Sequence, residues 1–345
     1  MGKKTKRTDV NKLGEFGLID HLTSSHQPMH PSTLKGIGDD AAVLDYGGKQ
    51  IVVTTDMLLE GIHFDLMYTP LKHLGYKSVV VNLSDICAMN AIPRQITVSI
   101  AISNRFSVEA LEELYDGIYA ACRNYNVDLV GGDTNSSKKG LVISITALGA
   151  VEKDKITYRS GARPGDILCV TGDLGASYLG LQILEREKQI WQSNPGVQPD
   201  LEKQTYLIGR QLKPEARTDM IVAFENSGFT PTSMIDISDG LASEIKHICK
   251  NSKVGALVEE GLVPIKDEAQ LMALKFKLDP ITCALSGGED YELLFTAAEK
   301  DLPTIRTLPG ISIIGEIKPR EEGVQLKTVN EKFHPITAQG WQHGK

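Results

Sequence analysis

Apolar positions in the first half of the chain follow two different periods. Stretches in which every second residue is apolar predict half-buried strands, and apolar residues three and four apart predict amphipathic helices. The predicted strands span residues 50–57, 94–103, 127–132 and 141–151. The predicted helices span residues 70–91 and 107–125. Pro70 and Ser107 stand where each helix begins, as first-turn proline and N-cap serine commonly do.

The second half mixes both periods again after a segment rich in glycine, proline and arginine at residues 158–166. Its predicted strands span residues 167–172, 255–260, 291–297 and 311–317. Its predicted helices span residues 174–187, 214–227 and 240–251. Because no regular βαβ repeat occurs, we expect an α+β (mixed α/β) fold with two domains, residues 1–157 and 158–345. Residues 188–200 are predicted to be exposed and have no assigned role.

Composition narrows the class of protein. The 345 residues are 41% hydrophobic and 23% charged, which is enough apolar material for two cores. The net charge of −7, without a basic stripe, argues against nucleic acid as a partner. No apolar run reaches the roughly 18 residues of a membrane span, and no apolar segment of a secretory signal follows the basic N-terminus. The five scattered cysteines form no C-x-x-C pair, which favours a cytoplasmic location.

The common nucleotide and hydrolase motifs are absent from the sequence. There is no G-x-x-x-x-G-K-[ST] loop, and "GIGDDA" lacks the third glycine of a dinucleotide fingerprint. Neither H-E-x-x-H nor G-x-S-x-G occurs. A Rossmann fold, a zinc protease and a serine hydrolase are therefore disfavoured.

Aspartate instead recurs at the edges of apolar runs, beside glycine, serine or threonine and with no lysine or arginine in the motif. The residues concerned are Asp39, Asp40, Asp56, Asp85, Asp133, Asp236 and Asp239. Any one of them is explained as well by a helix cap or a turn. Several partly buried carboxylates without basic partners, however, require another counter-charge, because an unpaired buried charge is very costly.

Divalent metal ions are the counter-charge that this residue set suits. Oxygen ligands without histidine or cysteine clusters point to Mg²⁺, which completes its shell with water and substrate phosphates. Glycines beside the acids let backbone amides approach phosphate closely. We therefore predict a site at which several Mg²⁺ ions bridge the phosphates of a nucleoside triphosphate during phosphoryl transfer.

Seven ordered motifs carry a resemblance to a known family. They are "GIGDDAAV", "TTDMLLEGIHF", "VNLSDICAMNAIP", "GGDT", "TYRSGARPGD", "DISDGL" and "SGGEDYELLF". In this order they resemble the thiamine-monophosphate kinase family, which belongs to the superfamily of aminoimidazole ribonucleotide synthetase and selenophosphate synthetase. The resemblance covers about residues 14 to 341, nearly the whole chain.

The resemblance implies a fold and a reaction. The N-terminal domain would contribute strands to a barrel that spans a homodimer, and a C-terminal α/β domain would pack on it. The partners would be ATP and thiamine monophosphate, converted to thiamine diphosphate by in-line phosphoryl transfer with several Mg²⁺ ions, the last step of thiamine diphosphate biosynthesis. Such a transfer depends on alignment and charge neutralisation, and the attacking phosphate is already ionised, so no strong base is needed.

The resemblance also implies roles for individual residues. The implied metal ligands are Asp40, Thr54, Thr55, Asp56, Asp85, Asp133, Asp236 and Asp239. The implied ATP contacts are Gly132, Asp133, Arg159 and Ser238, and the implied catalytic residues are Asp85, Asp133 and Arg159. The implied contacts to thiamine monophosphate are His63, Glu289 and Trp341.

Several alternatives stay open on the sequence alone. Asp39 fits a loop cap as well as a ligand, and Arg163 fits an ordinary surface position. Another ATP-dependent enzyme of the superfamily, such as aminoimidazole ribonucleotide synthetase, is a second candidate function. A non-catalytic ATP- or metal-binding module is a third, although acids kept in every loop argue against it.

Overall fold

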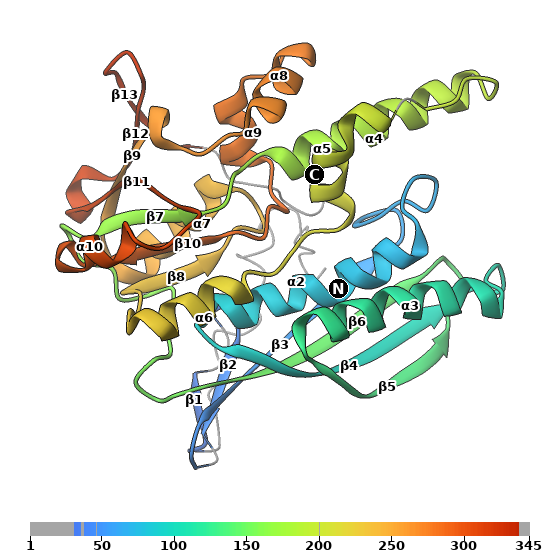
Figure 1. Cartoon of the computed structure of the whole chain (residues 1–345), viewed down its shortest axis with the longest axis horizontal. Coiled ribbons are helices and arrows are strands. Elements are labelled where there is room, and N and C mark those ends of the chain that lie inside the picture. The colour runs from blue at the N-terminus through green and yellow to red at the C-terminus, as the bar shows by residue number, and fades with distance from the viewer. Residues whose placement is uncertain (1–30, 36–37, 46, 200, 338–345) are drawn as a thin grey trace, which may run out of the picture.

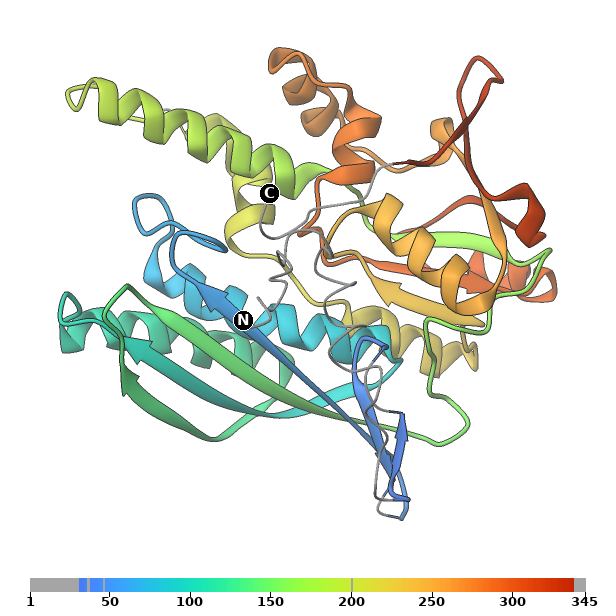
Figure 2. The same ribbon diagram turned by 180° about the vertical axis from the view of Figure 1, so that it is seen from behind.

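The structure is a computed structural model that describes residues 31–35, 38–45, 47–199 and 201–337. Within these residues the fold is mixed α/β and contains two open sheets (Figures 1 and 2). One has six strands in the order β1-β2-β3-β6-β4-β5, and the other has seven in the order β13-β12-β9-β11-β7-β10-β8. The expected mixed α/β class is confirmed, and neither sheet of the described residues closes into a barrel.

The six-stranded sheet comes from the first half of the chain. Its strands are β1 (Thr33–Lys35), β2 (Ala42–Asp45), β3 (Gln50–Leu59), β4 (Ile92–Ile102), β5 (Asp128–Ser136) and β6 (Val142–Val151). The helices of this half are α2 (Leu71–Ala88) and α3 (Val108–Tyr125). Both helices lie on one face of the sheet (Figure 1).

The seven-stranded sheet comes from the second half. Its strands are β7 (Ile167–Thr171), β8 (Ser233–Asp236), β9 (Gly255–Glu259), β10 (Leu293–Ala297), β11 (Ile311–Lys318), β12 (Val324–Lys327) and β13 (Phe333–Pro335). The helices of this half are α4 (Ala176–Ser193), α5 (Thr205–Leu212), α6 (Thr218–Ser227), α7 (Leu241–Ser252), α8 (Asp267–Lys275), α9 (Pro280–Ser286) and α10 (Leu302–Ile305).

Most of the predicted elements are confirmed, and three predicted boundaries are wrong by four residues or more. The strand predicted at 127–132 continues to Ser136, and the helix predicted at 174–187 continues to Ser193, into the stretch expected to be only an exposed excursion. The helix predicted from Pro214 begins at Thr218, because residues before it are held in a linker whose Ala216 N–H donates to Tyr125 Oη. The cysteines are unpaired and buried, as expected.

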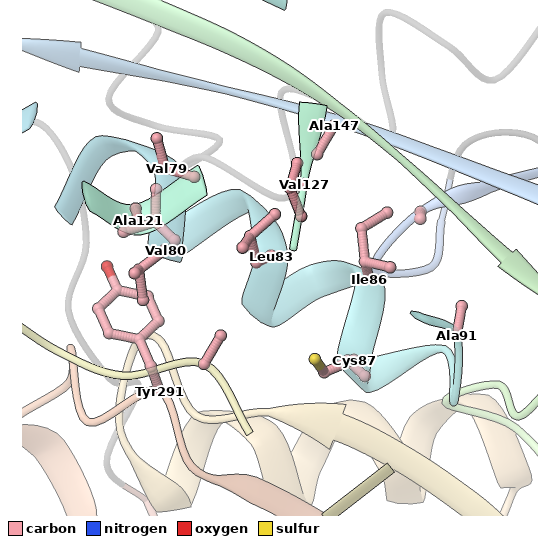
Figure 3. Packing of buried hydrophobic residues seen from close by; sticks show 14 of the residues in the cluster. Val79, Val80, Leu83, Ile86, Cys87, Ala91, Ala121, Val127, Ala147 and Tyr291 are labelled. Carbon is pink, nitrogen blue, oxygen red and sulfur yellow. The ribbon is translucent and has the colours of Figure 1, made fainter. Parts of the chain in front are cut away.

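Helix α2 is buried on all sides from Leu74 onward and joins the two halves. It packs against β3, β4 and β6 of the first sheet and against β8 of the second. Figure 3 shows Val79, Val80, Leu83, Ile86 and Cys87 of this helix in one apolar cluster that also contains Tyr291 from the second half. The burial explains why the sequence of α2 is apolar around its whole circumference rather than on one stripe. No helix among the described residues combines the length and apolarity needed to cross a bilayer.

Helices α2 and α3 approach closely because each carries a glycine at the crossing. A Cβ atom built on Gly75 of α2 would overlap the backbone oxygen of Leu114 on α3. One built on Gly117 of α3 would overlap the backbone oxygen of Lys72 on α2. Small residues at both contact points therefore set the distance between these helices.

We predict that Gly75→Ala lowers the free energy of unfolding by about 1 to 3 kcal/mol, because backbone must move to admit the methyl group. Urea denaturation of the purified protein measures the change. Gly209→Ala on α5 is the matched control, since its added Cβ meets no atom within 4 Å and alanine favours a helix interior. A Gly75→Ala protein as stable as the Gly209→Ala protein would contradict the account of the crossing.

Candidate metal and phosphate site

Three of the polar side chains on α2 contact the segments that carry the predicted acids. Asn82 Oδ1 accepts the backbone N–H of Asp56 at 2.9 Å, which ties α2 to β3. Ser84 Oγ donates to Asp236 Oδ2 at 2.6 Å, which ties α2 to the end of β8. Asp85 Oδ2 accepts from Thr54 Oγ1 at 2.6 Å. The polar positions of the buried helix therefore converge on the carboxylates that the sequence singled out.

Asp40, Asp85 and Asp236 form a carboxylate cluster. One oxygen atom from each lies within 4.8 Å of the other two. Asp40 precedes β2, Asp85 lies in the last turns of α2, and Asp236 ends β8, so the three come from segments far apart in the sequence. Among the described residues, this is the one group of three or more acidic, histidine or cysteine side chains that is close enough to share an ion.

Burial raises the pKa values of Asp85, Asp236 and the neighbouring Asp56. Burial raises the pKa of Asp85 well above its usual range, and the charges of Asp56, Asp236 and Asp40 add to the effect. Burial and then the charge of Asp40 raise the pKa of Asp236 to about 8. Burial raises the pKa of Asp56 to about 6. A bound cation would remove this penalty by stabilising the ionised carboxylates.

Arg159 supplies one positive charge to the carboxylate cluster, so the expectation that Asp40 lacks a basic partner is wrong. Its Nη2 donates to Asp40 Oδ1 at 2.8 Å and its Nε donates to Asp40 Oδ2 at 2.9 Å. The pair was invisible in the sequence motifs because the residues are 119 positions apart. One guanidinium still leaves the carboxylate cluster with an excess of potential negative charge.

Asp39 has a different task from its neighbour. Its Oδ1 accepts the backbone N–H groups of Asp40 and Arg159, both at 3.2 Å, and Lys35 Nζ lies 3.7 Å from its Oδ2. Burial and the charge of Asp40 raise its pKa to about 6. These contacts describe a loop-capping side chain, and Lys35 is a basic partner that the sequence motif did not reveal.

The donor set of the carboxylate cluster suits a hard divalent cation. Apart from the Arg159 guanidinium, which cannot ligate a cation, the side-chain groups that contact the cluster present oxygen, from the three carboxylates and the hydroxyl groups of Thr54 and Ser84. Oxygen ligands without nitrogen or sulfur favour Mg²⁺ over zinc or copper. The residues present therefore fit the metal that the sequence predicts.

The structure does not bring every predicted ligand to the carboxylate cluster. Thr55 follows Thr54 on a strand, so its side chain lies on the opposite face of the sheet, where its hydroxyl donates to the Ile145 backbone oxygen at 3.0 Å. Gly132 and Asp133 lie on β5, the exposed edge strand of the six-stranded sheet. These positions are separate from the three-carboxylate group found in the described residues.

Ser238 and Asp239 follow Asp236 of the carboxylate cluster by two and three residues, in the loop that joins β8 to α7. The Asp239 backbone N–H donates to Glu244 Oε1 at 3.0 Å. The Ser238 backbone oxygen accepts the N–H of Glu289 at 2.7 Å. This loop therefore connects the carboxylate cluster to the turn that carries a predicted substrate residue.

Of the three predicted substrate residues, Glu289 and His63 lie among the described residues. Glu289 is half-buried, and its carboxylate contacts Lys77 Nζ at 3.0 Å and Gln211 Nε2 at 2.7 Å. His63 lies in the loop after β3, and its Nδ1 accepts the Leu59 N–H at 3.0 Å. Trp341 lies outside the described residues. Arg163 is exposed in the loop before β7.

Lys77, Gln211 and Asn82 were missed by the sequence predictions. A signal for two of them was present, because Lys77 and Asn82 are polar residues within the mainly apolar sequence of a buried helix. Such interruptions indicate a buried polar contact. Gln211 had no comparable signal, because α5 itself was not predicted.

Two family models match the chain. The model described as AIR synthase related protein, N-terminal domain, matches residues 38–151. The model described as AIR synthase related protein, C-terminal domain, matches residues 163–327. Together they cover all strands of the two sheets except β1 and β13.

Curated thiamine-monophosphate kinases are similar to the chain over almost its full length. The protein of Buchnera aphidicola subsp. Schizaphis graminum is 35% identical, over 96% of this chain and 99% of the relative. The protein of Bacillus subtilis is 33% identical, over 96% of this chain and 100% of the relative.

Solved structures of such kinases share the fold. The structure described as AaThiL complexed with AMPPCP and TMP has a TM-score of 0.82 and 31% identity, and the match covers 98% of this chain and 100% of that one. The thiamine monophosphate kinase of Aquifex aeolicus has a TM-score of 0.75 and 29% identity, with 94% and 99% covered.

We predict that, without divalent ions, stability falls as pH rises from 5.5 to 8. The native carboxylates with raised pKa values hold protons that the unfolded chain has already lost above pH about 4, so their contribution is full at low pH and is lost as pH rises through about 8. Urea denaturation in EDTA should show a loss on the order of 1 to 3 kcal/mol. Added Mg²⁺ should stabilise the protein more at pH 8 than at pH 5.5.

Asp236→Asn is the variant that tests this pH dependence, because it removes one titrating group and keeps an oxygen that accepts from Ser84. Its stability should vary less with pH than that of the wild type. Asp128→Asn, an exposed acid on β5, is the control and should behave as the wild type. Equal pH dependence in all three proteins would contradict the account.

Proposed function

This chain belongs to the AIR synthase related family and is similar over nearly its full length to curated thiamine-monophosphate kinases. We propose that it phosphorylates thiamine monophosphate to thiamine diphosphate with ATP. The carboxylate cluster of Asp40, Asp85 and Asp236 carries the proposal, because it is a buried oxygen-donor site with insufficient positive charge of its own. The relative solved with AMPPCP and TMP supports the choice of ATP and thiamine monophosphate.

The metal that we propose for the carboxylate cluster is Mg²⁺. Asp40, Asp85 and Asp236 would hold it, with Asp56 and Thr54 beside them. The ion would neutralise the charge of the ATP phosphates and of the group in transfer. Asp239, Thr55 and Asp133 remain proposed ligands for further ions.

We propose that the Arg159 side chain binds a substrate phosphate directly, without a metal ion. Its planar guanidinium already forms two parallel hydrogen bonds with Asp40, and the same donors suit two phosphate oxygens. Two anions must approach each other during the transfer, so a guanidinium at this position would lower their repulsion. The attacking phosphate oxygen is ionised at neutral pH, and we assign no general base.

The two substrates are proposed to bind at different sides of the carboxylate cluster. The half-buried carboxylate of Glu289 would face the cationic thiazolium ring, and His63 and Trp341 would complete that side. Gly132 and Ser238 would contact ATP. Residues 1–157 and 158–345, the proposed domains, would each supply part of the site.

We further propose that the chain forms a homodimer through the six-stranded sheet. The face of this sheet opposite α2 and α3 presents apolar side chains to solvent, with Met57 54% exposed and Leu59 36% exposed. Val130 on the edge strand β5 is 60% exposed. A second copy covering this face, in the barrel that the family resemblance implies, would bury these side chains and bring Asp133 of β5 into an enclosed setting.

We predict that Met57→Glu converts the dimer into a monomer, because the interface would have to bury a carboxylate. Light scattering coupled to size exclusion measures the mass. Val222→Glu, at an apolar position on α6 that is 46% exposed, is the control and should stay dimeric. A wild-type protein that is monomeric at all concentrations would contradict the proposed dimer.

The proposed reaction is tested by incubating the protein with ATP, Mg²⁺ and thiamine monophosphate and measuring thiamine diphosphate by chromatography. Asp85→Asn should lower kcat by at least about 100-fold while the protein stays folded, because it removes a charge that would hold the metal. The control, Asp128→Asn, should turn over as the wild type does.

Two outcomes would contradict this proposal. A wild-type protein that makes no thiamine diphosphate but converts formylglycinamidine ribonucleotide would assign it to another reaction of the superfamily. Normal kinetics of Asp85→Asn would remove Asp85 from the proposed metal site.

A further inference from the structure

We propose that Lys77 and Gln211 are positioning residues that hold the Glu289 carboxylate in the orientation in which it meets the substrate cation. The inference rests on the proposed function, in which Glu289 contacts thiamine monophosphate. It adds a task for two residues that no sequence motif singled out. Their contacts to Glu289 come from α2 and α5, so both halves of the molecule fix this one carboxylate.

The backbone of Glu289 is in an unfavourable conformation that its surroundings enforce. Its φ angle is 57°, in the left-handed region that non-glycine residues rarely occupy, and Tyr291 is there too at 52°. Such conformations are unfavourable and persist where neighbouring contacts determine them. The Glu289 N–H donates to the Ser238 oxygen and the Tyr291 N–H donates to the Ile237 oxygen. The turn is therefore fixed against the loop beside the carboxylate cluster.

The side chain of Glu289 is held from behind and open in front. Lys77 Nζ lies 3.0 Å from Oε1, and Gln211 Nε2 donates to Oε2 at 2.7 Å. The Lys77 side chain is only 4% exposed, whereas that of Glu289 is 30% exposed. The carboxylate consequently presents its free side to solvent and its bound side to a buried ammonium group and amide.

The two supporting side chains are themselves fixed by hydrogen bonds. Lys77 Nζ also donates to the Gln211 backbone oxygen at 3.1 Å. Ser177 Oγ donates to Gln211 Oε1 at 2.7 Å, so the amide must direct its Nε2 to Glu289. This fixed orientation is what distinguishes a positioning network from a flexible surface ion pair.

The adjacent acid, Asp290, is used for structure instead. Its Oδ2 accepts the Gly175 N–H at 2.8 Å, its Oδ1 accepts the Ser177 N–H at 3.4 Å, and Arg210 Nη2 lies 3.8 Å from Oδ1. The Asp290 side chain is buried against the residues that begin α4, and of the two acids only Glu289 reaches solvent. In the Gly287-Gly288-Glu289-Asp290 segment, the Asp290 carboxylate thus anchors the turn and the Glu289 carboxylate faces outward.

Helix α2 sets the distance between the proposed substrate contact at Glu289 and the carboxylate cluster. Lys77 and Asp85 are eight residues apart on it, which corresponds to about 12 Å along a helix that rises 1.5 Å per residue. Lys77 fixes the proposed substrate carboxylate, and Asp85 belongs to the carboxylate cluster. One rigid, buried helix would therefore align the substrate ring with the site of phosphoryl transfer.

A double-mutant cycle tests this inference, using Lys77→Met, Glu289→Gln and the combined variant. With saturating ATP and Mg²⁺, Lys77→Met should raise the KM for thiamine monophosphate about tenfold, with kcat and the KM for ATP within about threefold of the wild type. In the Glu289→Gln background, Lys77→Met should change that KM less than twofold, because Lys77 acts through Glu289.

Two further variants control for charge and for folding. Lys72→Met makes the same substitution at an exposed position of α2 and should leave every constant unchanged. Gln211→Met removes the second contact to Glu289 without deleting a buried charge, and it should raise the KM for thiamine monophosphate about fivefold. If Lys77→Met does not fold, the KM of Gln211→Met for thiamine monophosphate tests the inference instead.

The possible results are distinct. An unchanged KM in Lys77→Met and Gln211→Met, even with lower melting temperatures, would show a purely structural network and overturn the inference. Equal KM increases from Lys77→Met in both backgrounds would show that Lys77 acts on the substrate independently of Glu289, which also overturns it. A wild-type protein without any turnover of thiamine monophosphate contradicts the proposed function, and this inference with it.

Discussion

Repulsion among three carboxylates, of which Asp40 and Asp236 are buried and Asp85 is half-buried, is the constraint on which the rest of the structure depends. Asp40, Asp85 and Asp236 have oxygens within 4.8 Å of one another, in surroundings that raise the pKa values of Asp85 and Asp236. The fold offsets part of this cost with hydroxyl donors from Thr54 and Ser84 and a guanidinium bound to Asp40. What remains is an affinity for further positive charge, which is the chemical basis of the proposed metal site.

The architecture places one buried helix at the centre of this arrangement. Helix α2 contacts both sheets, and its apolar side chains pack in a cluster that also contains Tyr291 from the second half (Figure 3). Its polar residues Asn82 and Asp85 hydrogen-bond to β3, and Ser84 hydrogen-bonds to β8. Close contact with α3 at Gly75 and Gly117 fixes the helix on the first sheet, and the hydrogen bond from Ser84 to Asp236 fixes the second sheet to it. The geometry of the candidate site is thus a consequence of core packing.

The sequence predicted local features well because they depend on neighbouring residues. Apolar periodicity located α2 and β3, and acids at the edges of apolar runs identified Asp85 and Asp236. The sequence did not predict contacts between residues that are far apart in the chain. No residue near Asp40 indicated its pairing with Arg159, and no residue near Glu289 indicated its pairing with Lys77. Short elements such as β8 were missed because four residues carry no measurable period. The separation of Thr54 from Thr55 depends on which face of β3 meets α2, which only packing determines.

A crystal structure with Mn²⁺ in place of Mg²⁺ and a non-hydrolysable ATP analogue tests the central claim most directly, since anomalous scattering locates the ions. The account predicts a peak roughly 2 Å from a carboxylate oxygen of Asp85 and from one of Asp40 or Asp236, with Arg159 bound to a phosphate oxygen. A bound nucleotide with no peak in the carboxylate cluster, and with Arg159 still paired to Asp40, would contradict it.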